Sequence, residues 1–205
     1  MARLSREEKR QETQEKIKSA ALKAFASNGF SGAAIDRITE EAGFSRGAFY
    51  SNYATKEELL LELLQEQHQR EINNWRSMIA GADNLDITYQ KMSEEFITYL
   101  QQAEWGLFNI EVQLYAKRNP EFAERYNHYV SEVNRNITDA LSAMYHKANR
   151  QIPEDLPLIA TMIRNLVIGI SLDTNNDNSQ AALQQCTQQL NLCIDSQIQR
   201  AALNT

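Results

Sequence analysis

The side chains best suited to binding a polyanion gather in residues 43–60, "GFSRGAFYSNYATKEELL". On a helical wheel, Phe49 and Tyr53 point inward. The opposite face is small or polar, and its candidate contact residues are Arg46, Gly47, Ala48, Tyr50, Ser51, Asn52 and, beyond that wheel, Lys56. A glycine inside a helix costs about 1 kcal/mol relative to alanine, so Gly47 predicts that another molecule approaches this backbone closely. Small residues would let a helix enter a DNA major groove, where the polar ones can reach base edges or phosphates.

The charge distribution makes the N-terminal part of the chain basic and the remainder acidic. Residues 1–56 hold ten lysines and arginines against seven aspartates and glutamates, a net +3, within a chain of 205 residues and net charge −6. The remaining residues carry −9. A basic module on an acidic body is expected where only one end contacts nucleic acid.

The elements that position these residues read as helices throughout. Three prolines, seven glycines and no useful strand-like alternation favour an all-α fold, with an N-terminal helix-turn-helix module and a C-terminal helical bundle. Ser5 with Glu8, and Thr55 with Glu58, have the form of capping boxes. Asn28-Gly29 is expected to stop the first helix, and Ser45 to cap the third. Further helices are expected at 35–42, 46–53, 56–80, 86–102, 104–118, 120–147, 157–173 and 179–202.

The segment "AALKAFASNGFSGAAIDRITEEAGFSRGAFYSNYATKEELL" resembles the N-terminal module of the tetracycline-repressor-like (TetR) family of bacterial regulators. The resemblance rests on A-x-x-x-F-x-x-x-G-F, I-x-x-I-x-x-x-A-G, S-R-G-A-F-Y and K-E-E-L-L, over some 45 residues. It implies a DNA-binding domain at 1–54 and an effector-binding and dimerisation domain at 55–205. It also implies a ligand-responsive regulator, expected to be a repressor, that binds a palindromic operator as a homodimer and is released by a small molecule.

The resemblance assigns roles along the segment. Arg46, Gly47 and Ala48 fall where the family approaches base edges, and Tyr50, Ser51 and Asn52 where it meets bases or phosphate. Lys56 falls on a phosphate-contacting position at a helix N-terminus. The chain departs from the family at Ala34, where serine or threonine is usual. Tyr50 could also serve partly as a core residue.

Polar or aromatic residues on apolar stripes are candidates for an effector pocket. His68 follows Leu60 and Leu64 at spacing four, and Glu111 lies in the apolar arc of "WGLFNIEVQLY". A carboxylate so placed must be paired, neutralised or exposed to a wet cavity. The predicted pocket residues are His68, Trp105, Phe108 and Glu111. Core packing for His68, Trp105 and Phe108, and an internal ion pair for Glu111, are the open alternatives.

The last two helices are candidates for the contact with a second chain. "LPLIATMIRNLVIGISL" is apolar on nearly all sides, and the last helix carries an apolar stripe at three- and four-residue spacing. Such helices would form a four-helix interface. The predicted interface residues are Ile163, Val167, Ile170, Leu183, Leu190 and Ile194, with burial inside one chain as the alternative.

Other classes of protein find less support. Only Glu124 and His128 have a metal-ligand spacing, and two ligands make a weak site. No catalytic residue, metal or cofactor is predicted, so an enzyme is the weaker alternative, as is a dimeric ligand carrier without DNA binding. With no apolar run of about 18 residues and no signal peptide, we expect no membrane partner and a cytoplasmic location.

Overall fold

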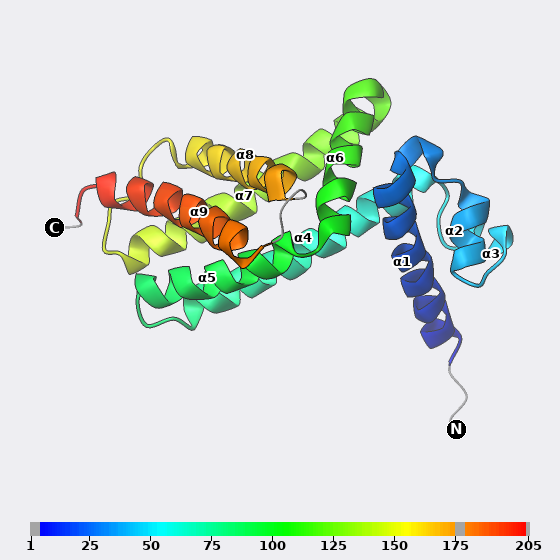
Figure 1. Ribbon diagram of the computed structural model, residues 1–205, viewed down its shortest axis with the longest axis horizontal. Helices are drawn as coiled ribbons and strands as arrows, with labels where there is room; N and C mark the ends of the chain where they lie inside the picture. The colour runs from blue at the N-terminus through cyan, green and yellow to red at the C-terminus, as the bar shows by residue number, and fades with distance from the viewer. Residues whose placement is uncertain (1–4, 175–178, 204–205) are drawn as a thin grey trace. The chain divides into compact units, whose positions relative to one another are not determined.

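The computed structural model describes residues 5–174 and 179–203, and the prediction of an all-α fold is confirmed there (Figure 1). The only pairing of extended backbone in these ranges is an isolated bridge between Arg150 and Leu203. Part of the predicted loop 173–179 lies outside the described residues. The helices are α1 (Arg6–Gly32), α2 (Ile35–Glu41), α3 (Arg46–Tyr50), α4 (Lys56–Ala80), α5 (Leu85–Leu100), α6 (Ala103–Arg118), α7 (Pro120–Lys147), α8 (Leu156–Thr174) and α9 (Gln180–Arg200).

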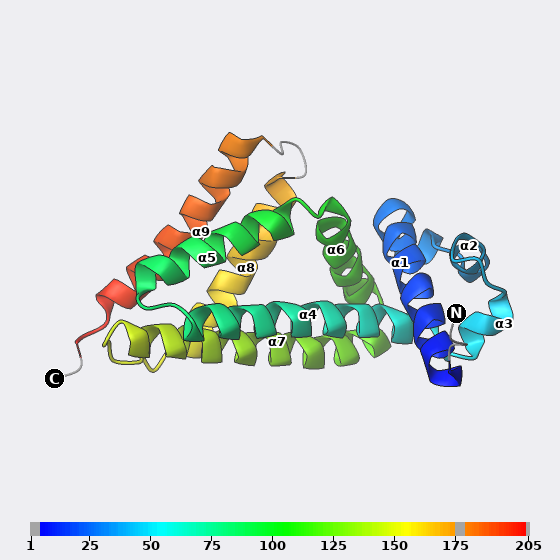
Figure 2. The same ribbon diagram turned by 90° about the horizontal axis from the view of Figure 1, so that it is seen from below.

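The chain divides into two compact units that do not follow the sequence order. The first unit contains residues 1–67 and 107–126, and the second contains 68–106 and 127–205. Helices α4, α6 and α7 therefore each contribute to both units (Figure 2). The predicted functional division between residues 54 and 55 is a different division and stays a prediction.

Local capping explains where several helices begin. Ser5 accepts a hydrogen bond from Glu8 N, and Glu8 Oε2 accepts one from Ser5 N at 2.7 Å, which confirms the first capping box. At α4, Thr55 Oγ1 accepts from Glu58 N at 3.1 Å. The returning bond to Glu58 comes from Ala54 N. Ser45 holds the N-cap position of α3, but the predicted side-chain cap is not formed. The backbone bond from Ala48 N to Ser45 O, at 2.9 Å, closes this one-turn helix.

The predicted stop at Gly29 is a break rather than an end. Gly29 has φ 70° and ψ 164°, and one further turn follows it before α1 ends at Gly32. This backbone conformation is almost restricted to glycine. A Cβ atom at Gly29 would also lie 2.8 Å from Glu111 Oε2 of α6. Gly29 thus lets the chain bend and lets α6 approach.

Replacing Gly29 by alanine should destabilise the first unit by about 1–3 kcal/mol, because alanine is strained at this positive φ. The Glu111 carboxylate, at the end of a flexible side chain, would move aside. Urea or thermal unfolding measures the loss. Gly32 in the same helix is the matched control, since a Cβ there meets only Asn28 Cβ at 3.6 Å. Equal stability of the two alanine variants would contradict this account.

The first unit is held by an aromatic core and by one buried lysine. Phe25 stacks on Phe108 of α6, with 6.0 Å between ring centroids. The Lys18 side chain is only 7% exposed, and its Nζ lies 2.6 Å from Glu66 Oε1 and 3.5 Å from Glu62 Oε1 on α4. Because a buried charge must be paired, this lysine fixes α1 against the first half of α4.

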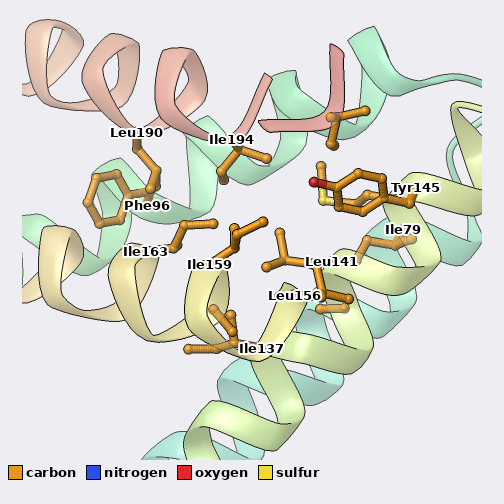
Figure 3. Close-up of a cluster of buried hydrophobic side chains, with 14 of the residues drawn as sticks. Ile79, Phe96, Ile137, Leu141, Tyr145, Leu156, Ile159, Ile163, Leu190 and Ile194 are labelled. Atoms are coloured by element: carbon orange, nitrogen blue, oxygen red, sulfur yellow. The ribbon is translucent and has the colours of Figure 1, made fainter. Parts of the chain in front are cut away.

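The second unit has a continuous apolar core formed by α4, α5, α7, α8 and α9 (Figure 3). In Figure 3, Leu190 and Ile194 of α9 point toward Phe96 of α5 and toward Ile159 and Ile163 of α8. The predicted interface needs correction here, because all its residues but one are at most 6% exposed within the single chain. They are Ile163, Ile170, Leu183, Leu190 and Ile194, and the remaining Val167 is half-buried against the same core.

Candidate nucleic-acid interface

Helices α2 and α3 form two short helices joined by a tight turn. Gly43 has φ +78° and supplies the turn, a conformation that favours glycine. Ile38 and Phe49 are fully buried. Their burial fixes α3 on the first unit and leaves its opposite face exposed.

Arg46 is held in place by a carboxylate that the sequence analysis missed. Its Nη1 donates to Asp36 Oδ1 and Oδ2 at 3.1 and 3.0 Å, and its Nη2 lies 3.4 Å from the Tyr50 hydroxyl. The guanidinium carbon is 5.6 Å from the centroid of the Tyr50 ring. All three side chains are exposed. Asp36 therefore orients the cation beside the outer face of α3.

Because Gly47, Ala48 and Ser51 are small, few side-chain atoms project from this part of the exposed face of α3. A Cβ atom at Gly47 would meet only Ser45 Oγ, at 3.6 Å, which is ordinary van der Waals contact. Ala48 is half-buried and Ser51 exposed, with Ser51 Oγ donating to Gly47 O at 2.9 Å. Space and backbone conformation within the chain would thus tolerate a larger residue at position 47.

Asn52 makes a hydrogen bond to the backbone of α3, and its predicted contact with bases or phosphate stays a prediction. Its Nδ2 donates to Ala48 O at 2.7 Å, and its Oδ1 is buried without a hydrogen-bond partner among the described residues. The side chain folds back onto the last turn of α3 because a free carbonyl is available there. In this arrangement the half-buried Asn52 side chain stabilises the end of α3.

Lys56 is also engaged inside the unit. Its Nζ donates to Phe30 O at 2.6 Å and to Ala33 O at 2.9 Å, and lies 4.4 Å from the Phe30 ring centroid. Burial lowers the pKa of this ammonium, and Glu57 opposes the effect. Lys56 therefore ties the start of α4 to the end of α1, with one of its three N–H groups left for another acceptor.

Glu57, which follows Lys56 in the chain, connects the start of α4 to α6. The Tyr115 hydroxyl donates to Glu57 Oε1 at 2.7 Å, and its ring lies 4.1 Å from that of Phe30. Burial and this bond raise the pKa of Tyr115 to about 12. The bond joins the first turn of α4 to this part of α6.

In the second unit, His68 belongs to a polar group between α4 and α7. Arg76 Nη2 donates to Asn136 Oδ1 at 3.2 Å, which turns Asn136 Nδ2 toward His68 Nε2 at 2.9 Å. His68 Nε2 is then the acceptor, and the neutral imidazole carries its proton on Nδ1. Burial lowers the pKa of His68, Glu132 raises it and Arg76 lowers it further. The group can donate and accept hydrogen bonds.

The other predicted pocket residues divide between the units. Trp105 is buried in the second unit. Phe108 is fully buried in the first, where it stacks on Phe25. Glu111 is half-buried in the first unit, with its carboxylate against Gly29. Their effector role stays a prediction.

Within the described residues, no group of three or more histidine, cysteine, aspartate and glutamate side chains could hold a metal ion. No helix in the part of the chain that the structure describes is long and apolar enough to cross a membrane.

The model of the family "Bacterial regulatory proteins, tetR family" matches residues 17–63, which contain α2, α3 and the start of α4. This segment of the chain, residues 17–63, belongs to the TetR family. The match to this family agrees with the exposed face of α3 and with the all-helical fold of the described residues.

Individual TetR-family relatives are distant. The regulator YerO of Bacillus subtilis is 22% identical over 152 residues, covering 73% of this chain and 52% of YerO, so the chain spans about half the length of that relative. The repressor AcnR of Corynebacterium glutamicum is 22% identical over 157 residues, 77% of this chain and 79% of AcnR. Among solved structures, FadR from B. subtilis in complex with stearoyl-CoA matches with a TM-score of 0.73 and 18% identity, covering 88% and 97% of the two chains. This likeness supports the fold.

Proposed function

We propose that the protein is a ligand-responsive regulator of transcription, acting in the cytoplasm as a homodimer on a near-palindromic DNA operator. Helix α3 of each chain enters the major groove, and the two grooves lie about 34–36 Å apart. The observation that carries the proposal is the open surface at Gly47, where neither space nor backbone conformation requires a glycine. A closely approaching duplex gives the reason for it.

The side chains act in three ways. Arg46, Tyr50 and Ser51 contact base edges or phosphates, and Gly47 and Ala48 permit the approach. Asn52 stabilises α3, while Lys56 offers its remaining N–H to a phosphate next to the first turn of α4. Asp36 holds Arg46 ready, so less conformational freedom is lost on binding.

The effector binds within the bundle and repression is relieved. His68, Arg76 and Asn136 offer a small-molecule ligand hydrogen bonds beside an apolar core. Trp105, Phe108 and Glu111 remain the candidates on α6. An effector that prefers one position of α6 would act on the start of α4 through Tyr115 and Glu57. The coupling is reciprocal, so operator binding weakens effector binding.

The homodimer forms through apolar side chains that a single chain leaves exposed. On α8 and α9 these are Leu158, Met162, Leu172 and Leu192, and they are called the outer patch here. They replace the buried residues first predicted for this contact. Exposed apolar groups gathered on two neighbouring helices are typical of a protein interface.

The experiment that tests the proposal first selects bound sites from random duplexes and then titrates the recovered site in a gel shift. We expect a near-palindrome, a steep loss of affinity with salt and a preference of about 10³-fold or more over a scrambled duplex of equal length. Failure to bind any duplex, with the homodimer intact, would instead favour the ligand carrier.

Enlarging residue 47 should separate folding from DNA binding. Gly47→Ala should keep or raise the melting temperature, since alanine favours a helix by about 1 kcal/mol. Operator affinity should fall about tenfold, equivalent to about 1.4 kcal/mol, and further for Gly47→Leu, because the added atoms occupy the space of the DNA. Unchanged affinity in the leucine variant would show that α3 does not approach the duplex closely.

A further inference from the structure

The first turns of α1 extend past the packed part of the first unit. The buried residues of α1 begin only at Ile17, and residues 6–12 are all exposed. In both views the N-terminal end of α1 reaches beyond α2 and α3 (Figures 1 and 2). Because no core covers residues 6–12, packing does not explain their charge pattern.

The charges of this segment are sorted by face. Arg6, Lys9, Arg10 and Lys16 recur at helical spacing within an arc of about 120°. The acidic residues of the same turns occupy the opposite arc, namely Glu7, Glu8, Glu12 and Glu15. We call the first arc, formed by Arg6, Lys9, Arg10 and Lys16, the basic face.

The two arcs also differ in what they bind within the chain. Three of the acidic residues have internal partners: Glu8 caps α1, Glu12 pairs with Lys16 at 2.7 Å and Glu15 pairs with Lys18 at 3.0 Å. Arg6, Lys9 and Arg10 form no ion pair with any residue in the described ranges. The cations of these turns that form no ion pair therefore lie together on one side of α1.

The basic face is turned toward the side of the unit that carries α3. It continues the line of Ile17 and Ala24, the stripe by which α1 packs on the rest of the unit. At its near end, Lys16 Nζ lies 6.0 Å from the centroid of the Phe44 ring. Phe44 directly precedes Ser45, the N-cap residue of α3.

We propose that these turns are a second DNA-contacting surface, in which Arg6, Lys9 and Arg10 bind phosphates beside the groove entered by α3. The inference rests on the proposed function and adds to it. Such contacts carry no sequence information, so they raise affinity for operator and non-operator duplexes alike. Each neutralised phosphate adds about 0.9 to the steepness of log affinity against log salt. Three cations in each of two chains would add about five.

The test replaces all three cations in the full-length chain, Arg6→Gln, Lys9→Gln and Arg10→Gln. Glutamine keeps a high helix propensity, so α1 should persist by circular dichroism. We expect weaker binding to both the operator and the non-operator duplex, with an unchanged ratio of the two affinities. The slope of log affinity against log salt should be shallower by several units. The matched control removes three exposed cations of the same unit that lie on other helices, Lys117→Gln, Arg118→Gln and Arg125→Gln.

Trimming the operator gives a second readout. The unaltered protein should lose affinity when base pairs flanking the half-sites are removed, and the triple variant should not. Salt dependence equal to that of the control variant would overturn the inference. So would loss of binding to vesicles of equimolar phosphatidylglycerol and phosphatidylethanolamine with DNA binding unchanged. If the unaltered protein bound no duplex, the proposed function itself would fail.

Discussion

Arg46→Ala is expected to weaken operator binding by about 2–6 kcal/mol, or about thirtyfold to twenty-thousandfold. An arginine that reads a base contributes about 1–3 kcal/mol, and each chain of the homodimer supplies one. Tyr50→Ala should have a similar effect, because Tyr50 contacts the guanidinium and shares its exposed face. Gel-shift titration at fixed salt measures both losses.

A control variant separates the loss of base recognition from the loss of a positive charge. Arg118→Ala removes an exposed cation of the same unit on α6 and should change affinity little. Arg46→Ala should also reduce the preference for the selected site, whereas loss of a phosphate contact alone would leave the preference intact. Sedimentation should find the homodimer unchanged in all three variants. If Arg46→Ala and Tyr50→Ala both bound normally, the proposed docking of α3 would be wrong.

Leu192→Asp is expected to convert the homodimer to a monomer. Leu192 is 72% exposed on α9, and Leu158 is 69% exposed on α8, so both are free to bind a second chain. An unpaired carboxylate inside an apolar interface is strongly unfavourable. Operator affinity should fall by about 10²–10⁴, because each half-site would then be bound independently. Sedimentation and gel-shift titration measure the two effects.

Two further variants serve as controls for Leu192→Asp. Ile152→Asp changes another exposed apolar residue, outside α8 and α9, and should leave the homodimer intact. Ile194→Asp should unfold the second unit, since Ile194 is only 2% exposed and belongs to its core. A Leu192→Asp variant that remained dimeric at low concentration would locate the interface elsewhere.

Local features were well predicted from the sequence. The capping box at Ser5, the Thr55 half of the second box and Pro120 at the start of α7 depend on residues a few positions apart. The inward side of α3 follows from helical periodicity, and Phe49 and Tyr53 are indeed buried. Short-range chemistry of this kind needs no knowledge of the tertiary structure.

Contacts between distant residues were not predictable in this way. The bond of Asp36 to Arg46 depends on the angle between α2 and α3, and that of Tyr115 to Glu57 joins residues 58 positions apart. The phosphate contact expected of Lys56 stays a prediction, and the two backbone carbonyls that accept from its Nζ were not predicted. Periodicity found the apolar stripe of α9, but it could not tell whether that stripe packs against its own chain or a partner.

The discontinuous first unit has a consequence for protein engineering. Residues 107–126 belong with residues 1–67, and they supply Phe108, Tyr115 and Phe122 to its aromatic core. A chimera made by cutting the gene once after the helix-turn-helix would leave that core without one of its walls. Fusing the first unit to the effector-binding domain of another protein therefore requires two junctions in the chain, so that residues 107–126 are transferred with residues 1–67.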